Sequence, residues 1–351
     1  LPFSDLLNWI LEEYAHNDSI FGIPSSLFYR PRAAAPYATT LYGQYLATPI
    51  GPGAGPHTQL AQNIVCAWLC GGRFIELKTV QIMDELQIPR PCIDLADEGY
   101  NVEWSQELRL DQSRREYVKA WVLIHVLDRL LFRSNDFSRF QAEGATQVAT
   151  TDADTHSNDF SRLGTIFNMS VGYNLEGVQS QPMTRFMDGL ADASAEIAEF
   201  QAILRQRPKF RDLDIPARIT DNVTLSTMHG CPPDEIEKIA RYLLVERGLH
   251  TIVKLNPTLL GQDEVLRILH DRLGFREIRI PDAVFEHDLQ YGRAVALIRS
   301  LKETAQKQGL HLSIKLSNTL AMANHKGVLP GQEMYMSGRS LYPLTMNLFH
   351  K

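Results

Sequence analysis

The feature that most constrains this chain is an alternation of short apolar segments, rich in β-branched residues, with longer amphipathic segments. The short segments suit strands that are buried on both faces, and the longer ones suit helices that cover such strands. This alternation predicts parallel strands joined by helical crossovers, which is an α/β fold. The expected strands are 74–80, 165–171, 222–228, 250–256, 276–280 and 311–317.

Helix signals lie between these strands. The segment 233–248 carries Pro233 in its first turn and ends at Gly248, and its apolar residues recur at helical spacing. Proline at the start and glycine at the end are common helix boundary signals. Further helices are expected over 57–72, 113–132, 183–207, 262–273 and 288–308.

The pattern along the chain also predicts its organisation. Residues 1–40 are expected to form a helical or extended lead-in, and 41–351 a single α/β barrel. Two polar stretches with little hydrophobic periodicity, 82–112 and 133–164, are expected to belong to an insertion at about 82–164. The Gly- and Pro-rich loop that ends at Pro56 would let the backbone approach a ligand closely.

Composition argues against several function classes. A net charge of −6 offers little attraction to nucleic acid or to an anionic membrane surface. The longest apolar runs fall far short of the roughly 20 residues that span a bilayer. Four cysteines without a disulfide or metal-ligand pattern favour a reducing compartment, so we expect the cytoplasm and no metal site. Cys66 and Cys70, spaced i, i+4, are interpreted as apolar helix residues.

Polar side chains gather at the C-terminal ends of the expected strands, which is the end where barrel enzymes build their sites. Lys78, Lys254 and Lys315 lie in or directly after apolar strands. A lysine there is costly to bury and should face a cavity or an anion. A structural ion pair would explain any one of them, but their similar positions favour a site.

Cys231 follows the loop Ser226–Gly230 and immediately precedes the helix that begins near Pro233. The positive end of the helix dipole favours thiolate, so we expect a lowered pKa and an accessible thiol that alkylates faster than Cys66 or Cys70. His229 could modulate this thiol. The alternative is a small buried residue that caps a loop.

Several motifs together indicate a family. ATPIGPGAGPHT and GGRFIELKTVQ resemble the first two strands of dihydroorotate dehydrogenases and of the flavin barrel of dihydropyrimidine dehydrogenases. FNMSVGYN, TLSTMHGCPPDEI, TIVKLNP, KLSNT and MYMSGRSLYPL match later segments of that barrel in the same order. The resemblance covers nearly the whole chain and is closest to the large flavin and iron–sulfur subunit of bacterial selenate reductases. It implies a TIM-type (β/α)8 barrel, dihydroorotate dehydrogenase-like and incomplete at the C-terminus.

The resemblance also implies a chemistry. It makes the chain an FMN-dependent oxidoreductase in which Cys231 is the acid/base that exchanges a proton with the substrate. The flavin contacts implied are Ala54, Gly55, Lys78, Asn174 and Lys254. The substrate contacts implied are Asn318, Thr319, Ser337 and Gly338. FAD, iron–sulfur clusters and any selenate chemistry would belong to domains or subunits outside this chain.

Two features depart from that family. Its NLSCPN loop is TLSTMHGCPP here, so a pyrimidine substrate is not assumed, and 276–280 is one strand more than the barrel needs. The phosphate-binding loops of such barrels follow the segment MSGRSLYPLTMN, so we expect weak or absent FMN binding by the chain as given. An alternative is that 276–280 helps to close a smaller barrel and that the loop Gly51–Gly55 binds the phosphate.

Other functions stay open at this point. The barrel could be catalytically silent and act as an assembly or electron-transfer scaffold, or it could be an aldolase-like lyase with Lys254 as Schiff base. The expected partners are a small-molecule substrate and the remainder of the polypeptide or partner redox subunits.

Overall fold

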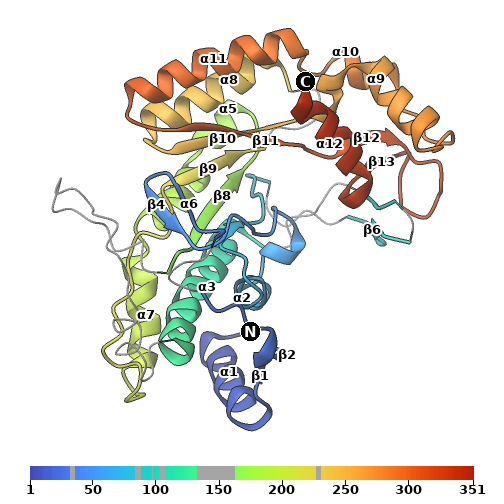
Figure 1. Ribbon diagram of the computed structural model, residues 1–351. Helices are drawn as coiled ribbons and strands as arrows, with labels where there is room; N and C mark the ends of the chain where they lie inside the picture. Colours follow the sequence, from blue (N-terminus) through green and yellow to red (C-terminus); the bar gives the residue numbers. More distant parts are fainter. Residues whose placement is uncertain (32–35, 84–87, 97, 103–107, 133–162, 227–230) are drawn as a thin grey trace. The chain divides into compact units, whose positions relative to one another are not determined.

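The computed structural model describes residues 1–31, 36–83, 88–96, 98–102, 108–132, 163–226 and 231–351 (Figure 1). The chain divides into two compact units. Unit 1 consists of Leu1–Lys78, Asp111–Asn168 and Arg185–Thr220. Unit 2 consists of Thr79–Leu110, Met169–Thr184 and Asp221–Lys351.

A 5-stranded sheet has the order β11-β10-β9-β8-β5, and every neighbouring pair in it is parallel. This confirms the predicted α/β class. Its strands are β5 (Phe74–Glu76), β8 (Ile166–Val171), β9 (Asn222–Leu225), β10 (His250–Leu255) and β11 (Leu312–Leu316).

One predicted strand is wrong. Residues 276–280 form a turn and irregular backbone rather than a strand. The Phe275 N–H donates to the Leu269 carbonyl at 2.9 Å, and the Ile278 N–H donates to the Phe275 carbonyl at 3.2 Å. These local bonds turn the chain, so the surplus strand of the sequence pattern disappears.

Unit 1 consists mainly of helices, together with β5 and the first half of β8. Trp121 packs edge-on against Phe167 of β8, with ring centroids 5.2 Å apart, and the Trp68 indole N–H donates to Thr165 Oγ1 at 3.1 Å. The predicted helix over 183–207 is divided, because the Asp192 carboxylate accepts from the Ser194 N–H at 3.0 Å and starts a new helix. The helices are α1 (Phe3–Asn17), α2 (Ala61–Leu69), α3 (Leu110–Leu131), α6 (Gln181–Ala191) and α7 (Ser194–Leu204).

Arg73 lies fully buried in unit 1, just before β5. Its guanidinium carbon is 4.6 Å from the centre of the Trp68 ring and 5.3 Å from that of Tyr29. Burial lowers the pKa of Arg73 to about 10. The side chain is therefore held by aromatic faces and by a bond of 2.6 Å from Nη1 to the Trp68 carbonyl.

The first part of the chain also contains two antiparallel hairpins. Strand β1 (Ser19–Ile20) pairs with β2 (Ile23–Pro24), and β3 (Thr39–Leu41) pairs with β4 (Gln44–Leu46). The second of these hairpins thus directly precedes the Gly- and Pro-rich loop that ends at Pro56.

In unit 2 the helices are α5 (Leu175–Gln179), α8 (Pro233–Arg241), α9 (Gln262–Leu266), α10 (Asp282–Glu286), α11 (Tyr291–Lys307) and α12 (Leu341–His350). Both α8 and α9 continue into π-helical turns, at Tyr242–Glu246 and Arg267–Arg272. Helices α8 and α11 lie side by side (Figure 1). The expected helices over 233–248, 262–273 and 288–308 are confirmed in outline.

A second, antiparallel sheet in unit 2 has the order β12-β13-β7-β6. Its strands are β6 (Ile93–Asp94), β7 (Tyr100–Asn101), β12 (Leu320–Ala323) and β13 (Glu333–Met336). Part of the predicted insertion thus pairs with strands near the C-terminus. Helix α3 also falls within the predicted insertion, whose residues 84–87, 97, 103–107 and 133–162 lie outside the described ranges. Among the described helices, none combines the length and apolarity needed to cross a membrane.

Candidate functional site

The parallel strands of unit 2 have one polar and one apolar face. Side chains alternate along a strand, and register partners on parallel strands point to the same face. Lys254 of β10 is the partner of Lys315 on β11, and Val253 is the partner of Leu225 on β9. The polar face carries Ser170, Thr224, Ser226, Lys254, Ser313 and Lys315, with Ile252 as its apolar member. The apolar face carries Met169, Val171, Val223, Leu225, Val253, Leu255, Leu312, Ile314 and Leu316, with Thr251 as its polar member.

On β8 and β9 the polar face becomes accessible towards the C-terminal ends of the strands, and on the edge strand β11 Ser313 is half-buried as well. Ser170 and Thr224 are each 1% exposed, whereas Ser226, Lys254 and Lys315, which lie closer to the C-terminal ends, are half-buried. The Lys254 ammonium donates to Ser226 Oγ at 3.1 Å. A ligand could therefore reach these groups at the end of the sheet where barrel enzymes place their sites.

A buried carboxylate lies at the C-terminal end of β10. The Asn256 amide donates to both oxygens of Asp288, at 2.9 and 2.7 Å. Thr258 Oγ1 donates to Asp288 Oδ2 at 2.6 Å, and the Leu289 N–H donates to Oδ1 at 3.0 Å. These four bonds satisfy the charge and fix its position.

Asp288 is a site residue that the sequence alone did not indicate. Asn256 and Thr258 follow a strand and could be seen as polar strand-end residues. Asp288 lies in the short link between α10 and α11, where a lone aspartate carries no distinguishing signal.

Cys231 is half-buried directly before α8. Burial raises the pKa of its thiol to about 11, with further contributions from the charges of Glu235 and Asp288. The predicted lowering of this pKa is wrong, because burial disfavours the thiolate and the carboxylates of Glu235, in the first turn of α8, and of Asp288 disfavour it further. Burial raises the pKa of Cys66 to about 11 as well. His229 and its neighbours 227–230 lie outside the described residues.

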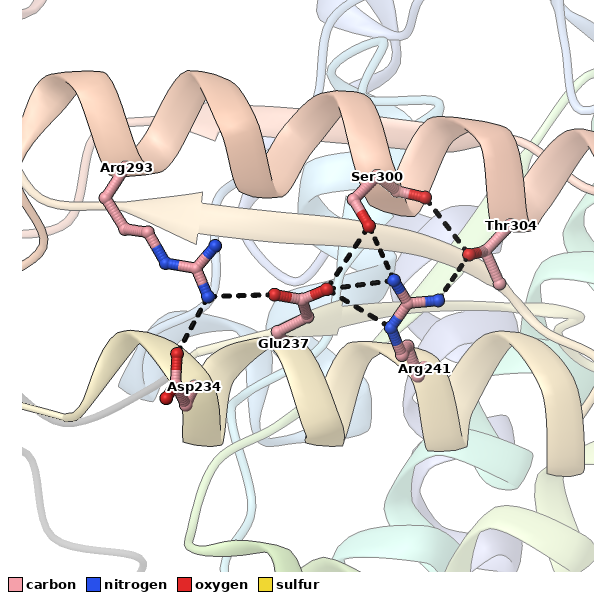
Figure 2. Close-up of polar contacts among 6 residues, drawn as sticks. All are labelled: Asp234, Glu237, Arg241, Arg293, Ser300 and Thr304. Atoms are coloured by element: carbon pink, nitrogen blue, oxygen red, sulfur yellow. Dashed lines mark hydrogen bonds and ion pairs between the residues drawn. The ribbon is translucent and has the colours of Figure 1, made fainter.

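Two sets of polar contacts fix the start of α8. The Leu175 N–H at the start of α5 donates to Glu235 at 2.7 Å. Glu237 forms the centre of the second set, in which it accepts from Arg241 at 2.9 Å and from Arg293 at 3.0 Å (Figure 2).

The rest of that network joins α8 to α11. Arg241 also donates to Thr304 Oγ1 at 2.6 Å and to Ser300 Oγ at 2.5 Å, and Arg293 donates to Asp234 at 2.7 Å (Figure 2). The helix that follows Cys231 is therefore tied to its neighbours at both ends.

The structure places the other predicted residues of unit 2 as follows. The Asn318 N–H donates to the Leu255 carbonyl at 2.7 Å, and Asn318 Oδ1 accepts from the Thr319 N–H at 2.9 Å. Asn318 and Lys254 thus lie at the end of β10, and the charge of Asp288 raises the pKa of Cys231.

Three other predicted residues have mainly structural contacts. Asn174 is exposed and caps α5, where its Oδ1 accepts from the Gly177 N–H at 2.9 Å. Ser337 lies beyond β13, and its N–H donates to the Gly99 carbonyl at 2.9 Å. Gly338 begins a 3₁₀ turn with a φ of 67°.

The remaining predicted residues lie in unit 1. The Ala54 N–H donates to Glu76 at 2.8 Å, and the Gly55 N–H donates to Thr58 Oγ1 at 3.2 Å, so both amides already have acceptors. Lys78 is buried, and its carbonyl accepts from the Tyr117 hydroxyl at 3.1 Å. That these three meet the residues of unit 2 in one cavity stays a prediction.

Known proteins similar to this chain are long. YgfK of Escherichia coli (strain K12) is 45% identical over 368 residues, which cover 99% of this chain and 33% of that protein. YgfK of Escherichia coli O157:H7 matches equally. The chain therefore spans about a third of the length of these relatives. Among solved structures, a ligand-free DHODH from Eimeria tenella is 14% identical with a TM-score of 0.37, covering 89% of this chain and 82% of that one, a likeness too weak to carry an argument.

The family comparison matches residues 21–351, described as the N-terminal TIM-barrel domain of the oxidoreductase YgfK. The parallel strands with helical crossovers are those of such a barrel, as expected from the sequence. This chain belongs to the family of the YgfK N-terminal TIM-barrel domain.

Proposed function

We propose that this chain is the flavin-binding barrel of an FMN-dependent oxidoreductase that works within a longer polypeptide. The observation that carries the proposal is the polar face of the sheet. Its residues Ser170 and Thr224 are buried, whereas Ser226, Lys254 and Lys315, nearer the C-terminal ends of the strands, are half-buried. The donors there suit the carbonyl oxygens and ring nitrogens of a flavin, and a nearby cation suits its reduced, anionic form. On this test the residues fit the cofactor.

The residues proposed to hold the flavin are Lys254 with Ser226, together with Lys78 by its resemblance to the flavin-contacting lysine. FMN would supply the acceptor or donor of a hydride. Ala54 and Gly55 would contribute surface to the ring rather than hydrogen bonds, since their amides are engaged. Asn174 would have a smaller part in flavin binding, because its side chain is exposed and already caps helix α5.

Cys231 is proposed as the proton donor to the substrate. A thiol with a pKa of about 11 is protonated at neutral pH, so its resting form is the acid. Asn318 would orient the substrate through its side-chain amide, and Thr319, Ser337 and Gly338 would lie around the same ligand. FAD, iron–sulfur clusters and selenate chemistry would belong to the other two thirds of the longer relatives.

The test uses the full-length polypeptide. Purified protein should be yellow, and denaturation should release about one FMN per chain. Lys254→Met should lower the flavin content, whereas Lys302→Met, an exposed lysine of α11, should not. Colourless wild-type protein that takes up no added FMN would refute the proposal.

A second experiment separates an enzyme from a silent scaffold. Cys231→Ser should retain flavin but lose most turnover with compounds that have a C=C bond beside an amide carbonyl. Full turnover in this variant would remove Cys231 from the mechanism.

A further inference from the structure

We propose that Asn256 is a further flavin-binding residue, whose side-chain oxygen accepts the N3–H of the isoalloxazine ring. The inference rests on the proposed function, because it takes FMN to be the ligand near Lys254. The resemblance to flavin barrels assigns no role to Asn256. Its contacts with Asp288 supply one.

Asn256 follows β10 directly and continues the alternation of its side chains. Its backbone is extended, with a φ of −89° and a ψ of 149°, so its side chain lies on the same side of the strand as that of Lys254, two residues earlier. Asn256 is also nearer the C-terminal end of the sheet, from which a ligand would enter. The two side chains are therefore successive groups on the polar face.

Asp288 fixes the direction in which the Asn256 amide points. Asn256 Nδ2 donates to both Asp288 oxygens, at 2.9 and 2.7 Å, and an ionised carboxylate can only accept hydrogen bonds. The reversed amide would place its own acceptor against two further acceptors. Thr258 Oγ1 and the Leu289 N–H hold the carboxylate in turn, at 2.6 and 3.0 Å. Asn256 Oδ1 is thus held facing away from Asp288.

This oxygen is available to a ligand. No described residue donates a hydrogen bond to Asn256 Oδ1. Asn256 is 8% exposed, and Oδ1 is not among the fully buried polar atoms without a partner in the described ranges, so it retains contact with solvent. An acceptor held in one direction selects a ligand that presents a donor, because two facing acceptors would both stay unpaired.

The edge of the flavin ring offers that donor. Oxidised isoalloxazine carries a single N–H, at N3, between the carbonyl groups at C2 and C4. Lys254 can donate to a carbonyl oxygen of the ring, and Asn256 Oδ1 can accept from the N–H beside it. A donor next to an acceptor on the protein thus matches an acceptor next to a donor on the ring.

The experiment compares the binding of FMN with that of 3-methyl-FMN, in which a methyl group replaces the N3 hydrogen. Full-length protein is stripped of flavin, and dissociation constants are measured from the quenching of flavin fluorescence. Wild-type protein should bind 3-methyl-FMN at least about tenfold more weakly than FMN, because the methyl group leaves Asn256 Oδ1 without a donor.

The variants separate the hydrogen bond from the bulk of the methyl group. Asn256→Ala should bind FMN about tenfold more weakly than wild type and should bind both flavins nearly equally, because it lacks the acceptor and gives the methyl group room. Asp288→Asn lets the Asn256 amide reverse and should reduce the preference for FMN. The control Asn17→Ala, at an exposed position of α1, should keep the wild-type constants.

The outcomes distinguish this inference from the proposed function. Equal binding of the two flavins by wild-type protein overturns the inference, and so does wild-type affinity for FMN in a folded Asn256→Ala variant. FMN still binds in both cases, so the proposed function stands. Thermal melting establishes that the variant is folded, and the wild-type comparison decides the matter if it is not. Protein that binds neither flavin refutes the proposed function and this inference with it.

Discussion

The two faces of the parallel sheet in unit 2 differ in chemistry and in accessibility. Along β8 and β9, the apolar positions Val171, Val223 and Leu225 are all 0% exposed, so there this face is a hydrophobic core, whereas Ile314 of the edge strand β11 is 45% exposed. The opposite face holds hydroxyls at depth and two lysines at its accessible end. The comparison teaches that the same short strands contribute apolar packing on one side and hydroxyl and ammonium groups, proposed to bind a ligand, on the other.

The largest effect should follow from a charge on the apolar face. Val253→Asp places a carboxylate at a position that is 1% exposed, between its register partners Leu225 and Ile314. We expect a loss of more than about 4 kcal/mol in the free energy of unfolding, which denaturant titration would measure. Ser313→Asp, on the polar face, should cost less than about 1 kcal/mol. Equal losses in the two variants would contradict the assignment of the faces.

A smaller loss of stability is expected when Asp288, the carboxylate bound at the C-terminal end of β10, is removed. Asp288→Ala leaves the Asn256 amide and the Thr258 hydroxyl, both buried, without their acceptor. This should cost about 2–3 kcal/mol of stability. It should also lower the pKa of Cys231, because one of the charges that raise it is gone. If thiol titration gives Cys231 the same pKa in the variant and in the wild type, Asp288 does not influence Cys231.

The network between α8 and α11 should contribute less, since Arg241 is 41% exposed. Arg241→Met is expected to cost about 1 kcal/mol at neutral pH. The pKa of Glu237 is lowered, chiefly by its hydrogen bond from Arg241, so this contribution is complete above the ordinary value of 4.5 and is lost as pH falls through the lowered pKa. The gap between wild type and variant should therefore narrow in acid. A gap that widens in acid would mean that Glu237 is not the partner.

The smallest effect concerns cysteine reactivity in the wild-type protein. With its pKa raised to about 11, Cys231 should alkylate at neutral pH more slowly than Cys70, which is exposed. Iodoacetamide labelling followed by peptide mass spectrometry would rank the thiols. Fastest labelling at Cys231 would restore the original expectation of an activated thiolate.

Much of the fold could be predicted from the sequence because local signals agree with tertiary structure. The apolar segments at β8, β9, β10 and β11 are rich in β-branched residues and lie between helices with clear boundaries. At 276–280 the pattern of alternating residues is strand-like, but hydrogen bonds around Phe275 bend the backbone instead. At this segment the local hydrogen bonds of the turn, and not the side-chain pattern, determine the backbone conformation.

The candidate site was less predictable. The alternation that divides the faces is visible in the sequence around Val253 and Lys254, yet apolar content alone suggested burial on both sides. Asp288 and its effect on Cys231 depend on contacts between residues far apart in the chain, which no local pattern encodes. The helix dipole was a sound argument for Cys231, but burial and nearby carboxylates outweigh it.

The aromatic packing of unit 1 has a practical consequence. Within the described ranges, the tryptophans are Trp9, Trp68 and Trp121, and all three belong to unit 1. Trp68 and Trp121 are each 1% exposed, and the Arg73 guanidinium lies against the Trp68 ring. Their emission should be blue-shifted in the native protein and move to longer wavelength when unit 1 opens. In a Trp104→Phe variant, which removes the one further tryptophan of the sequence, intrinsic fluorescence would thus offer an optical reporter of this unit, to be set beside flavin absorbance as a reporter of the proposed site.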